Sequence, residues 1–221
     1  MKMRQCIAIL GGSFDPVHNG HLALGRHVCA TTGADQLRLL PAGQPWQKGS
    51  LRAGPHVRAE MLQLAFADSG LPTDLDLREA DQDSPCFTVQ TLRALRAEVG
   101  PDVSLVFVLG ADQWQRLHTW REWEQLFVLA HLAVVSRPGF DCTAAPVVAQ
   151  QAQARFAPPV QLRDSAAGHC LLLPDLAHDV SATRVRQLLA QSVPDWRELA
   201  QLLPAKVLDY IQYHQLYRHG N

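Results

Sequence analysis

Short apolar runs recur along the chain and alternate with longer amphipathic stretches. A strand covered on both faces carries apolar residues at consecutive positions, so each run predicts a buried strand. The predicted strands are Cys6–Leu10, Leu37–Leu40, Leu75–Leu77, Val103–Leu109, Leu132–Ser136 and Cys170–Leu173. The helical patterns between them are Gly20–Thr31, Pro55–Ala67, Thr88–Val99, Trp120–Leu129 and Thr143–Ala154. This alternation is typical of βαβ units, and we predict a doubly wound α/β fold with a mostly parallel sheet.

The end of the chain has a different pattern. From about Asp179 it is helical, with Ser181 as the N-cap of a helix over 182–189 and further helices opening at Pro194 and Pro204. We predict a single domain, residues 1–221, with an α/β core over 1–178 and a helical C-terminal subregion over 179–221. The stretch 141–168, rich in Ala, Gln and Pro, predicts a surface helix and a loop.

The segments that follow the predicted strands are candidates for a binding crevice. In open parallel sheets, ligands bind beyond the carboxyl ends of the strands. The segments 11–21, 41–48, 110–120 and 136–139 all occupy such positions. We therefore expect them to line one crevice.

Charge and cysteine content exclude several classes of protein. The 20 basic and 21 acidic residues of the 221-residue chain give a net charge of -1, which disfavours a nucleic-acid-binding protein. Five cysteines without a C-x-x-C pair indicate reduced thiols and a cytoplasmic protein. No signal peptide is apparent, and no apolar run approaches the ~18 residues that span a membrane. The oligomeric state stays open, a homo-oligomer included.

The segment 11–21, Gly-Gly-Ser-Phe-Asp-Pro-Val-His-Asn-Gly-His, directly follows the first strand. Gly11 and Gly12 let the backbone turn and approach a ligand closely. The helix start behind them suits phosphate, because its N–H groups and dipole are positive. His18 and His21, at i and i+3, lie on one face of that first turn. The alternative is that the histidines only cap the helix or lie in the core.

A second polar cluster starts the helix at Ser181. Ser181 and Thr183 offer hydroxyl donors, and Arg186 lies one turn further on, where its guanidinium can bind phosphate in a fork geometry. The alternative is an ordinary capped helix with a solvated arginine.

These segments resemble a known superfamily. They are neither a Walker loop nor a G-x-G-x-x-G fingerprint. His18-Asn19-Gly20-His21 resembles the HxGH signature of the nucleotidylyltransferases, and Ser181–Arg186 resembles its S-x-T-x-x-R motif. Further segments are similar to bacterial nicotinate-nucleotide adenylyltransferases over nearly the whole chain. They are Gly11–His21, Pro85–Leu92, Gly110–Asp112 with Thr119–Arg121, Ser136–Gly139 and Leu203–Tyr217.

The resemblance implies a reaction between ATP and nicotinate mononucleotide that gives nicotinate adenine dinucleotide and pyrophosphate. The mononucleotide phosphate attacks the α-phosphorus in line, without a covalent enzyme intermediate. His18 and His21 hold the ATP phosphates, and His21 steadies the reacting α-phosphate. Arg186 and Ser181 hold the β/γ end. Mg²⁺ neutralises the leaving group, and no protein ligand to a metal is predicted.

The resemblance also implies two sets of binding residues. Asp112 contacts ribose or organises the site, or it caps a helix. Trp120 stacks on the pyridine ring or is a core residue. For ATP the set is Gly11, Gly12, Ser13, Phe14, His18, His21, Gly110, Asp112, Ser181, Thr183 and Arg186. For nicotinate mononucleotide it is Lys48, Thr88, Trp120 and Arg137.

The chain departs from the family pattern at two places. The family's P-x-x-x-P-P-H-K loop has Trp46 for a proline and Gln47 for the histidine, which leaves Lys48 as the candidate phosphate contact. Gln47 cannot carry a charge, so we expect altered affinity and retained activity. Arg184 stands where small or apolar residues are common and is either an extra phosphate contact or merely exposed.

Other functions stay open at this point. One is a preference for nicotinamide mononucleotide or another phosphorylated acceptor, including those of other adenylyl- and cytidylyltransferases. Another, from a different class, is a non-catalytic nucleotide-binding module. A class I aminoacyl-tRNA synthetase would need a lysine-rich second loop and a tRNA-binding domain, which this short, near-neutral chain lacks.

Overall fold

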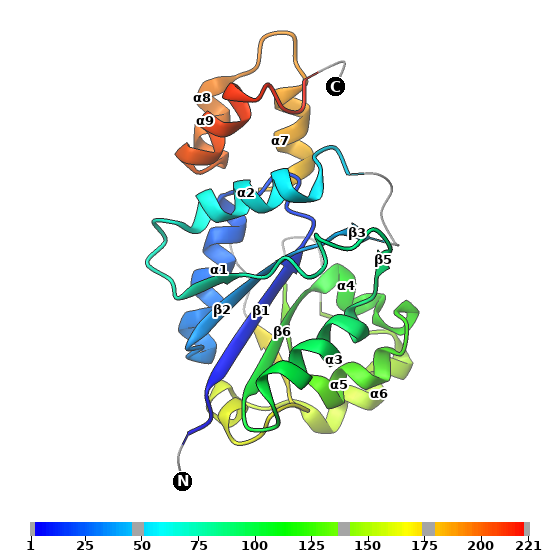
Figure 1. Ribbon diagram of the computed structural model, residues 1–221. Coiled ribbons are helices and arrows are strands. Elements are labelled where there is room, and N and C mark those ends of the chain that lie inside the picture. Colours follow the sequence, from blue (N-terminus) through cyan, green and yellow to red (C-terminus); the bar gives the residue numbers. More distant parts are fainter. Residues whose placement is uncertain (1–2, 46–50, 137–141, 174–179, 219–221) are drawn as a thin grey trace.

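A six-stranded parallel sheet forms the centre of the molecule (Figure 1). The computed structural model describes residues 3–45, 51–136, 142–173 and 180–218. The strands, in spatial order, are β4 (Thr73–Leu75), β2 (Gln36–Pro41), β1 (Cys6–Gly12), β6 (Ser104–Gly110), β7 (His131–Val135) and β8 (Cys170–Leu173). A separate parallel pair joins β3 (Gln44–Pro45) and β5 (Pro85–Cys86). The predicted fold class is confirmed.

Helices cover both faces of the sheet. One face carries α1 (Asn19–Thr32) and α2 (Pro55–Phe66), extended by α7 (Ala182–Leu189), α8 (Trp196–Leu202) and α9 (Ala205–Tyr213). The other carries α3 (Thr88–Val99), α4 (Ala111–Gln115), α5 (Leu126–Leu129) and α6 (Pro146–Ala152). Figure 1 shows α7–α9, coloured orange to red, grouped at one end of the molecule next to α1 and α2.

The central strands alternate between two apolar cores. In β1, Ala8 and Leu10 belong to the core under α1 and α2, whereas Ile7 and Ile9 belong to the core under α3–α6. Successive side chains of a strand point to opposite faces, so a strand buried on both faces must be apolar throughout. This is why the run at 103–109 predicted β6 from sequence.

The direction in which successive strands are added to the sheet changes between β1 and β6. From β1 the chain passes outward to β2 and β4, and it then returns on the other side of β1 to build β6, β7 and β8. Such a switch point leaves a crevice at the carboxyl ends of the two neighbouring strands. Here those ends are Gly12 and Gly110.

The predicted helix over Trp120–Leu129 is wrong. Trp120 has extended backbone between two single 3₁₀ turns, Leu117–Thr119 and Trp123–Gln125, and only α5 is helical beyond them. The reason is Glu122, whose left-handed conformation (φ 50°) interrupts the helix while its carboxylate pairs with Arg93 of α3.

Smaller differences occur at other elements. The third predicted strand, Leu75–Leu77, is β4 at Thr73–Leu75, and α6 begins at Pro146, three residues later than expected. The short α4 and the β3–β5 pair were not predicted. Within the described residues, no helix is both long and apolar enough to cross a membrane.

Candidate active site

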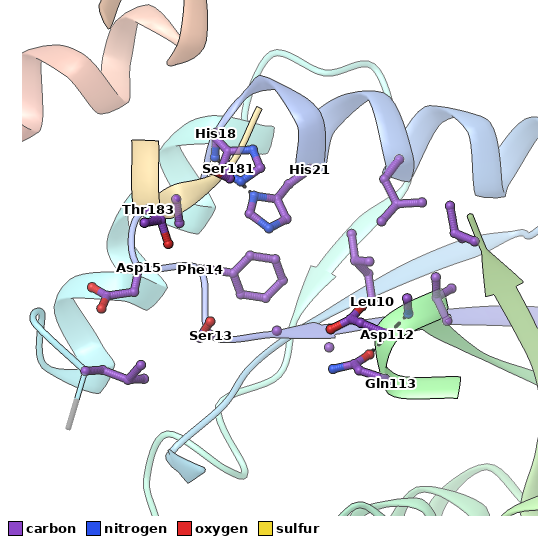
Figure 2. A pocket seen from close by; sticks show the side chains of 18 of the residues that line it. Leu10, Ser13, Phe14, Asp15, His18, His21, Asp112, Gln113, Ser181 and Thr183 are labelled. Atoms are coloured by element: carbon purple, nitrogen blue, oxygen red, sulfur yellow. Dashed lines mark hydrogen bonds between the residues drawn. The ribbon is translucent and has the colours of Figure 1, made fainter. Parts of the chain in front are cut away.

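A hollow of about 560 Å³ opens at the carboxyl ends of the central strands (Figure 2). Three parts of the chain supply its polar wall: the loop from β1 to α1, the start of α4, and the start of α7. Figure 2 shows Ser181 and Thr183 on one side, Asp112 and Gln113 on the other, and His21 with Phe14 between them. The lining includes Gly11, Gly12, Ser13, Phe14, Asp15, His18, His21, Arg52, Gly110, Asp112, Gln113, Ser181, Thr183 and Arg186.

Gly11 and Gly12 do not form the turn that the sequence predicts, because β1 runs straight through both. The backbone turns after them, at Phe14, whose φ of 47° is left-handed. Gly12 has another role: a Cβ there would lie 3.1 Å from the ring of Phe14, tighter than an ordinary contact. The glycine thus leaves room for this buried ring, which meets the His21 ring in an edge arrangement at 4.9 Å between centroids.

The two histidines form one stacked pair at the start of α1. Their ring centroids are 3.8 Å apart with an interplanar angle of 28°. His18 is the N-cap residue, and its backbone N–H donates to Nδ1 of His21 over 3.2 Å. Since Nδ1 accepts, neutral His21 carries its proton on Nε2 and can donate it to an anion without being charged. The histidines therefore both cap the helix and line the hollow.

Arg186 joins the second motif to the first. Its Nη1 donates to the backbone carbonyl of Asp15 over 2.6 Å, and its Nη2 to the Thr183 hydroxyl over 3.3 Å. Ser181 caps α7 by accepting the Arg184 N–H over 3.2 Å. The side chain of Arg184 points elsewhere and pairs with Glu198 over 2.8 Å. Of the two arginines in the motif, only Arg186 lines the hollow.

The carboxylate of Asp15 links two further segments, a role that was missed by sequence reasoning. It accepts the backbone N–H groups of Arg52 and Ala53 over 2.8 and 3.1 Å, and the Tyr217 hydroxyl over 2.8 Å. Asp15 is 3 % exposed, and burial raises the pKa of Tyr217, which stays a neutral donor. The signals in the sequence were the place of Asp15 within the motif 11–21 and the family-like ending that contains Tyr217.

A fully buried arginine, Arg58, fixes the other side of the same loop. It donates to the backbone carbonyls of Ser13 (2.7 Å), Ala42 (2.6 Å), Gly43 (3.2 Å) and Ala53 (3.0 Å). Burial lowers the pKa of Arg58. The Arg58 side chain on α2 therefore holds the loop between β1 and α1 close to the segment after β2. Sequence reasoning also missed this role.

Asp112 lies in the first turn of α4, exposed, at the rim of the hollow. The side-chain contact to the Gly110 N–H of this helix comes from Gln113, over 3.2 Å, whereas Asp112 contributes an acidic group to the first turn. A Cβ on Gly110 would lie 2.5 Å from the present position of the Asp112 carboxylate, so a larger residue there would require that side chain to move.

Trp120 and Thr88 lie away from the hollow, over the opposite face of the sheet. The Trp120 ring meets Phe107 edge to face at 6.5 Å, and Phe107 lies 3.6 Å from the position of a Cβ on Gly11. Thr88 is the first residue of α3. The expectation that the segment 110–120 lines one crevice is therefore wrong for Trp120, which is not among the residues that line this hollow, and Gly11 lies between the hollow and the Phe107–Trp120 pair.

The chain is similar to known proteins over nearly its whole length. A model of the "Cytidylyltransferase-like" family matches residues 9–188. A protein of Herminiimonas arsenicoxydans, named "Probable nicotinate-nucleotide adenylyltransferase", is 46 % identical over 98 % of this chain and 99 % of its own. One of Chromobacterium violaceum with the same name is 42 % identical over 98 % and 100 %. The chain belongs to the nicotinate-nucleotide adenylyltransferase family.

The fold of the family also recurs in a distant solved structure. The Plasmodium falciparum nicotinic acid mononucleotide adenylyltransferase complexed with NaAD has a TM-score of 0.73 with 20 % identity, over 96 % of this chain and 97 % of that one. At this identity the likeness concerns the fold alone.

The family substitutions at Trp46 and Gln47, and the candidate contacts Lys48 and Arg137, lie outside the described residues. Their predicted roles stay predictions. Among the residues that the structure does describe, no cluster of three or more His, Cys, Asp or Glu side chains could hold a metal ion.

Proposed function

We propose that the chain transfers the adenylyl group of ATP to nicotinate mononucleotide, giving nicotinate adenine dinucleotide and pyrophosphate, a step of NAD biosynthesis. The observation that carries the proposal is the bond from Arg186 to Asp15, which brings both family motifs to one hollow. The names of relatives that match nearly the whole chain support the same reaction.

The geometry suits catalysis by positioning and charge stabilisation. In an in-line displacement the acceptor phosphate itself is the nucleophile, so no side chain needs to form a covalent bond. The Nε2–H of His21 is the donor for the α-phosphate, where charge develops. Two of the five N–H groups of Arg186 bind Asp15 and Thr183, which orients the guanidinium toward the β/γ end. Mg²⁺ bound to ATP would neutralise the charge of the departing pyrophosphate.

The acceptor would lie on the Trp120 side of Gly11. Trp120 offers an indole face for a pyridine ring, and its Nε1–H is buried without an acceptor among the described residues. An aromatic acceptor with a polar substituent would supply one. Because Gly11 has no side chain, the phosphate of such an acceptor could approach the α-phosphorus held at His21.

The chain has five cysteines and no C-x-x-C pair, and Cys29 and Cys142 are only half-buried, which supports a reducing compartment such as the cytoplasm. The near-neutral charge supports small-molecule partners over nucleic acid.

The decisive experiment measures pyrophosphate release from ATP with nicotinate mononucleotide and nicotinamide mononucleotide in parallel. We expect turnover with the acid. Turnover with the amide alone would favour the amide-specific alternative. ATP binding without turnover on either would favour a non-catalytic nucleotide-binding module.

Substitution of Trp120 tests the acceptor wall. Trp120→Ala should raise the KM for nicotinate mononucleotide about tenfold through lost stacking and contact area, with the KM for ATP unchanged. The control is Trp123→Ala, since Trp123 packs on Phe127 and lines neither wall. Equal KM changes for both substrates would contradict the assignment of Trp120 to the acceptor.

A further inference from the structure

A second, smaller hollow of about 200 Å³ lies beyond Arg186, on the side away from Asp112. Arg52, Thr183 and Arg186 line both hollows, so the two adjoin. The remaining walls come from α7 and from the end of the chain. They are Gln187, Ala190, Tyr217 and Arg218.

The walls of this hollow carry positive charge without a matching carboxylate. Arg52, Arg186 and Arg218 supply three guanidinium groups, and the lining within the described residues includes no acidic side chain. None of the three forms an ion pair with a described carboxylate, whereas the exposed Arg93 and Arg184 both do. Concave surfaces lined by one sign of charge concentrate ions of the opposite sign.

The nearest acidic group does not cancel this charge. Asp15 is buried behind Tyr217, and its carboxylate already accepts three hydrogen bonds. Those bonds hold the backbone of Arg52 and the ring of Tyr217, while the Asp15 carbonyl holds Arg186. Asp15 therefore holds the backbone of Arg52, the side chain of Arg186 and the ring of Tyr217, which directly precedes Arg218.

The size of the hollow restricts the anion. Cavities that hold drug-sized ligands measure about 300–1,000 Å³, and this hollow, at about 200 Å³, is smaller. We therefore expect it to take a compact anion such as a diphosphate and not a whole nucleotide. Its position next to Arg186 places it at the terminal-phosphate end of the larger hollow.

We propose that this hollow is an exit subsite for pyrophosphate, in which Arg52 and Arg218 bind the leaving group. The proposal rests on the proposed function. A bond forms between an oxygen of the acceptor phosphate and the α-phosphorus of ATP. The bond from the α-phosphorus to the α,β-bridging oxygen breaks, and its electron pair leaves on pyrophosphate. The displaced anion moves past Arg186 into the arginine-lined hollow, and in the reverse reaction pyrophosphate enters there.

The test is a calorimetric titration of the protein with inorganic pyrophosphate, followed by pyrophosphorolysis of the dinucleotide. Arg218→Gln and Arg52→Gln should each raise the Kd for pyrophosphate, and its KM in the reverse reaction, about five- to tenfold. In Arg218→Gln, whose side chain lines only the smaller hollow, the KM for the dinucleotide should stay unchanged. Both side chains are exposed, and the Arg52 N–H that binds Asp15 is retained, so the variants should fold. Arg197→Gln, on exposed α8 and in neither hollow, is the charge-matched control.

Wild-type pyrophosphate affinity in both Arg218→Gln and Arg52→Gln would overturn the proposal. An equal loss in Arg197→Gln would also overturn it, because the effect would then come from net charge. The titration needs no acceptor substrate, so it tests pyrophosphate binding in this hollow independently of the proposed reaction. Failure of that reaction would appear as wild-type protein that turns over neither mononucleotide.

Discussion

Two stacked histidine pairs lie at opposite edges of the described sheet, and of these two pairs His18 and His21 line the large hollow. His18 and His21 stack at the carboxyl edge, with centroids 3.8 Å apart. His131 and His169 stack at the amino ends of β7 and β8, with centroids 5.2 Å apart and rings 4° from parallel. In both pairs a backbone N–H donates to a ring Nδ1, from His18 to His21 and from His169 to His131.

The difference lies in the second ring nitrogen. Nε2 of His131 contacts the carbonyl of Ser165 over 3.1 Å, and the residue is completely buried. His21 lines the large hollow, and the same tautomer there puts an N–H donor within reach of a ligand. Two stacked histidines are therefore not sufficient to identify a binding site. The backbone N–H that donates to Nδ1 sets the tautomer in both pairs. The position of the pair, at the carboxyl or the amino edge of the sheet, decides whether Nε2 faces a ligand hollow or a backbone carbonyl.

The strongest test of this comparison removes Nε2 of His21 and keeps its Nδ1 contact. In His21→Asn, the amide oxygen can still accept the His18 N–H, so the helix cap survives while the phosphate donor is lost. We expect kcat to fall about 10²–10³-fold, the usual cost of losing one transition-state donor. The melting temperature should change by no more than a few degrees. The control is His56→Asn on the surface of α2, and a wild-type kcat in His21→Asn would remove the proposed role.

Substitution of His131 in the buried pair should change the free energy of unfolding and leave the kinetic constants unchanged. Desolvation lowers the pKa of His131 from 6.5 to about 4. The unfolded chain then binds the proton more readily, so stability is complete above pH 6.5 and is lost as the pH falls toward 4. Relative to His131→Asn, the wild type should lose about 3 kcal/mol of unfolding free energy between pH 7 and pH 4. Urea unfolding at both pH values checks this, and a difference independent of pH would contradict it.

The pair of His18 and His21, unlike the buried pair, follows a loop that Tyr217 holds through Asp15. Tyr217→Phe removes one hydrogen bond to Asp15 and should cost about 1 kcal/mol of unfolding free energy. It should lower kcat/KM for ATP about three- to tenfold because Asp15 also holds Arg186, and leave the KM for the mononucleotide unchanged. Tyr213→Phe, on a residue 84 % exposed, is the control. Equal changes in the kinetic constants for ATP and for the mononucleotide would indicate that Tyr217→Phe affects folding and not the position of the loop.

The smallest effect is expected at His169. In His169→Ala the backbone N–H that donates to His131 remains, and only the ring contact is lost. We expect about 1 kcal/mol or less of unfolding free energy and unchanged kinetic constants for both substrates. A loss of activity would show that the amino edge of the sheet influences the hollow.

Much of the fold could be predicted because apolar runs report directly on burial. The runs at 6–10 and 103–109 gave the two central strands, and the switch point between them located the crevice. The helix expected at 120–129 failed because a left-handed residue and an ion pair to α3 decide that backbone. Neither is visible in a periodic pattern.

The candidate site was predictable only where side chains themselves carry the motif. His18, His21, Ser181, Thr183 and Arg186 all line the hollow as expected. Arg58 and Tyr217 were missed, because their partners are backbone carbonyls and a carboxylate up to 202 residues away. Such contacts leave no local spacing to recognise. Thr88 and Trp120, found by resemblance alone, lie over a different face from the hollow.

The bond between Tyr217 and Asp15 has a consequence for how the protein is made. Translation produces the histidine motif well before Tyr217, which lies 202 residues after Asp15 and holds it. A nascent chain, or a product of premature termination before residue 217, contains both motifs but not the phenol that holds Asp15. Full activity is therefore expected only once the chain has been made through Tyr217 and this residue can reach Asp15.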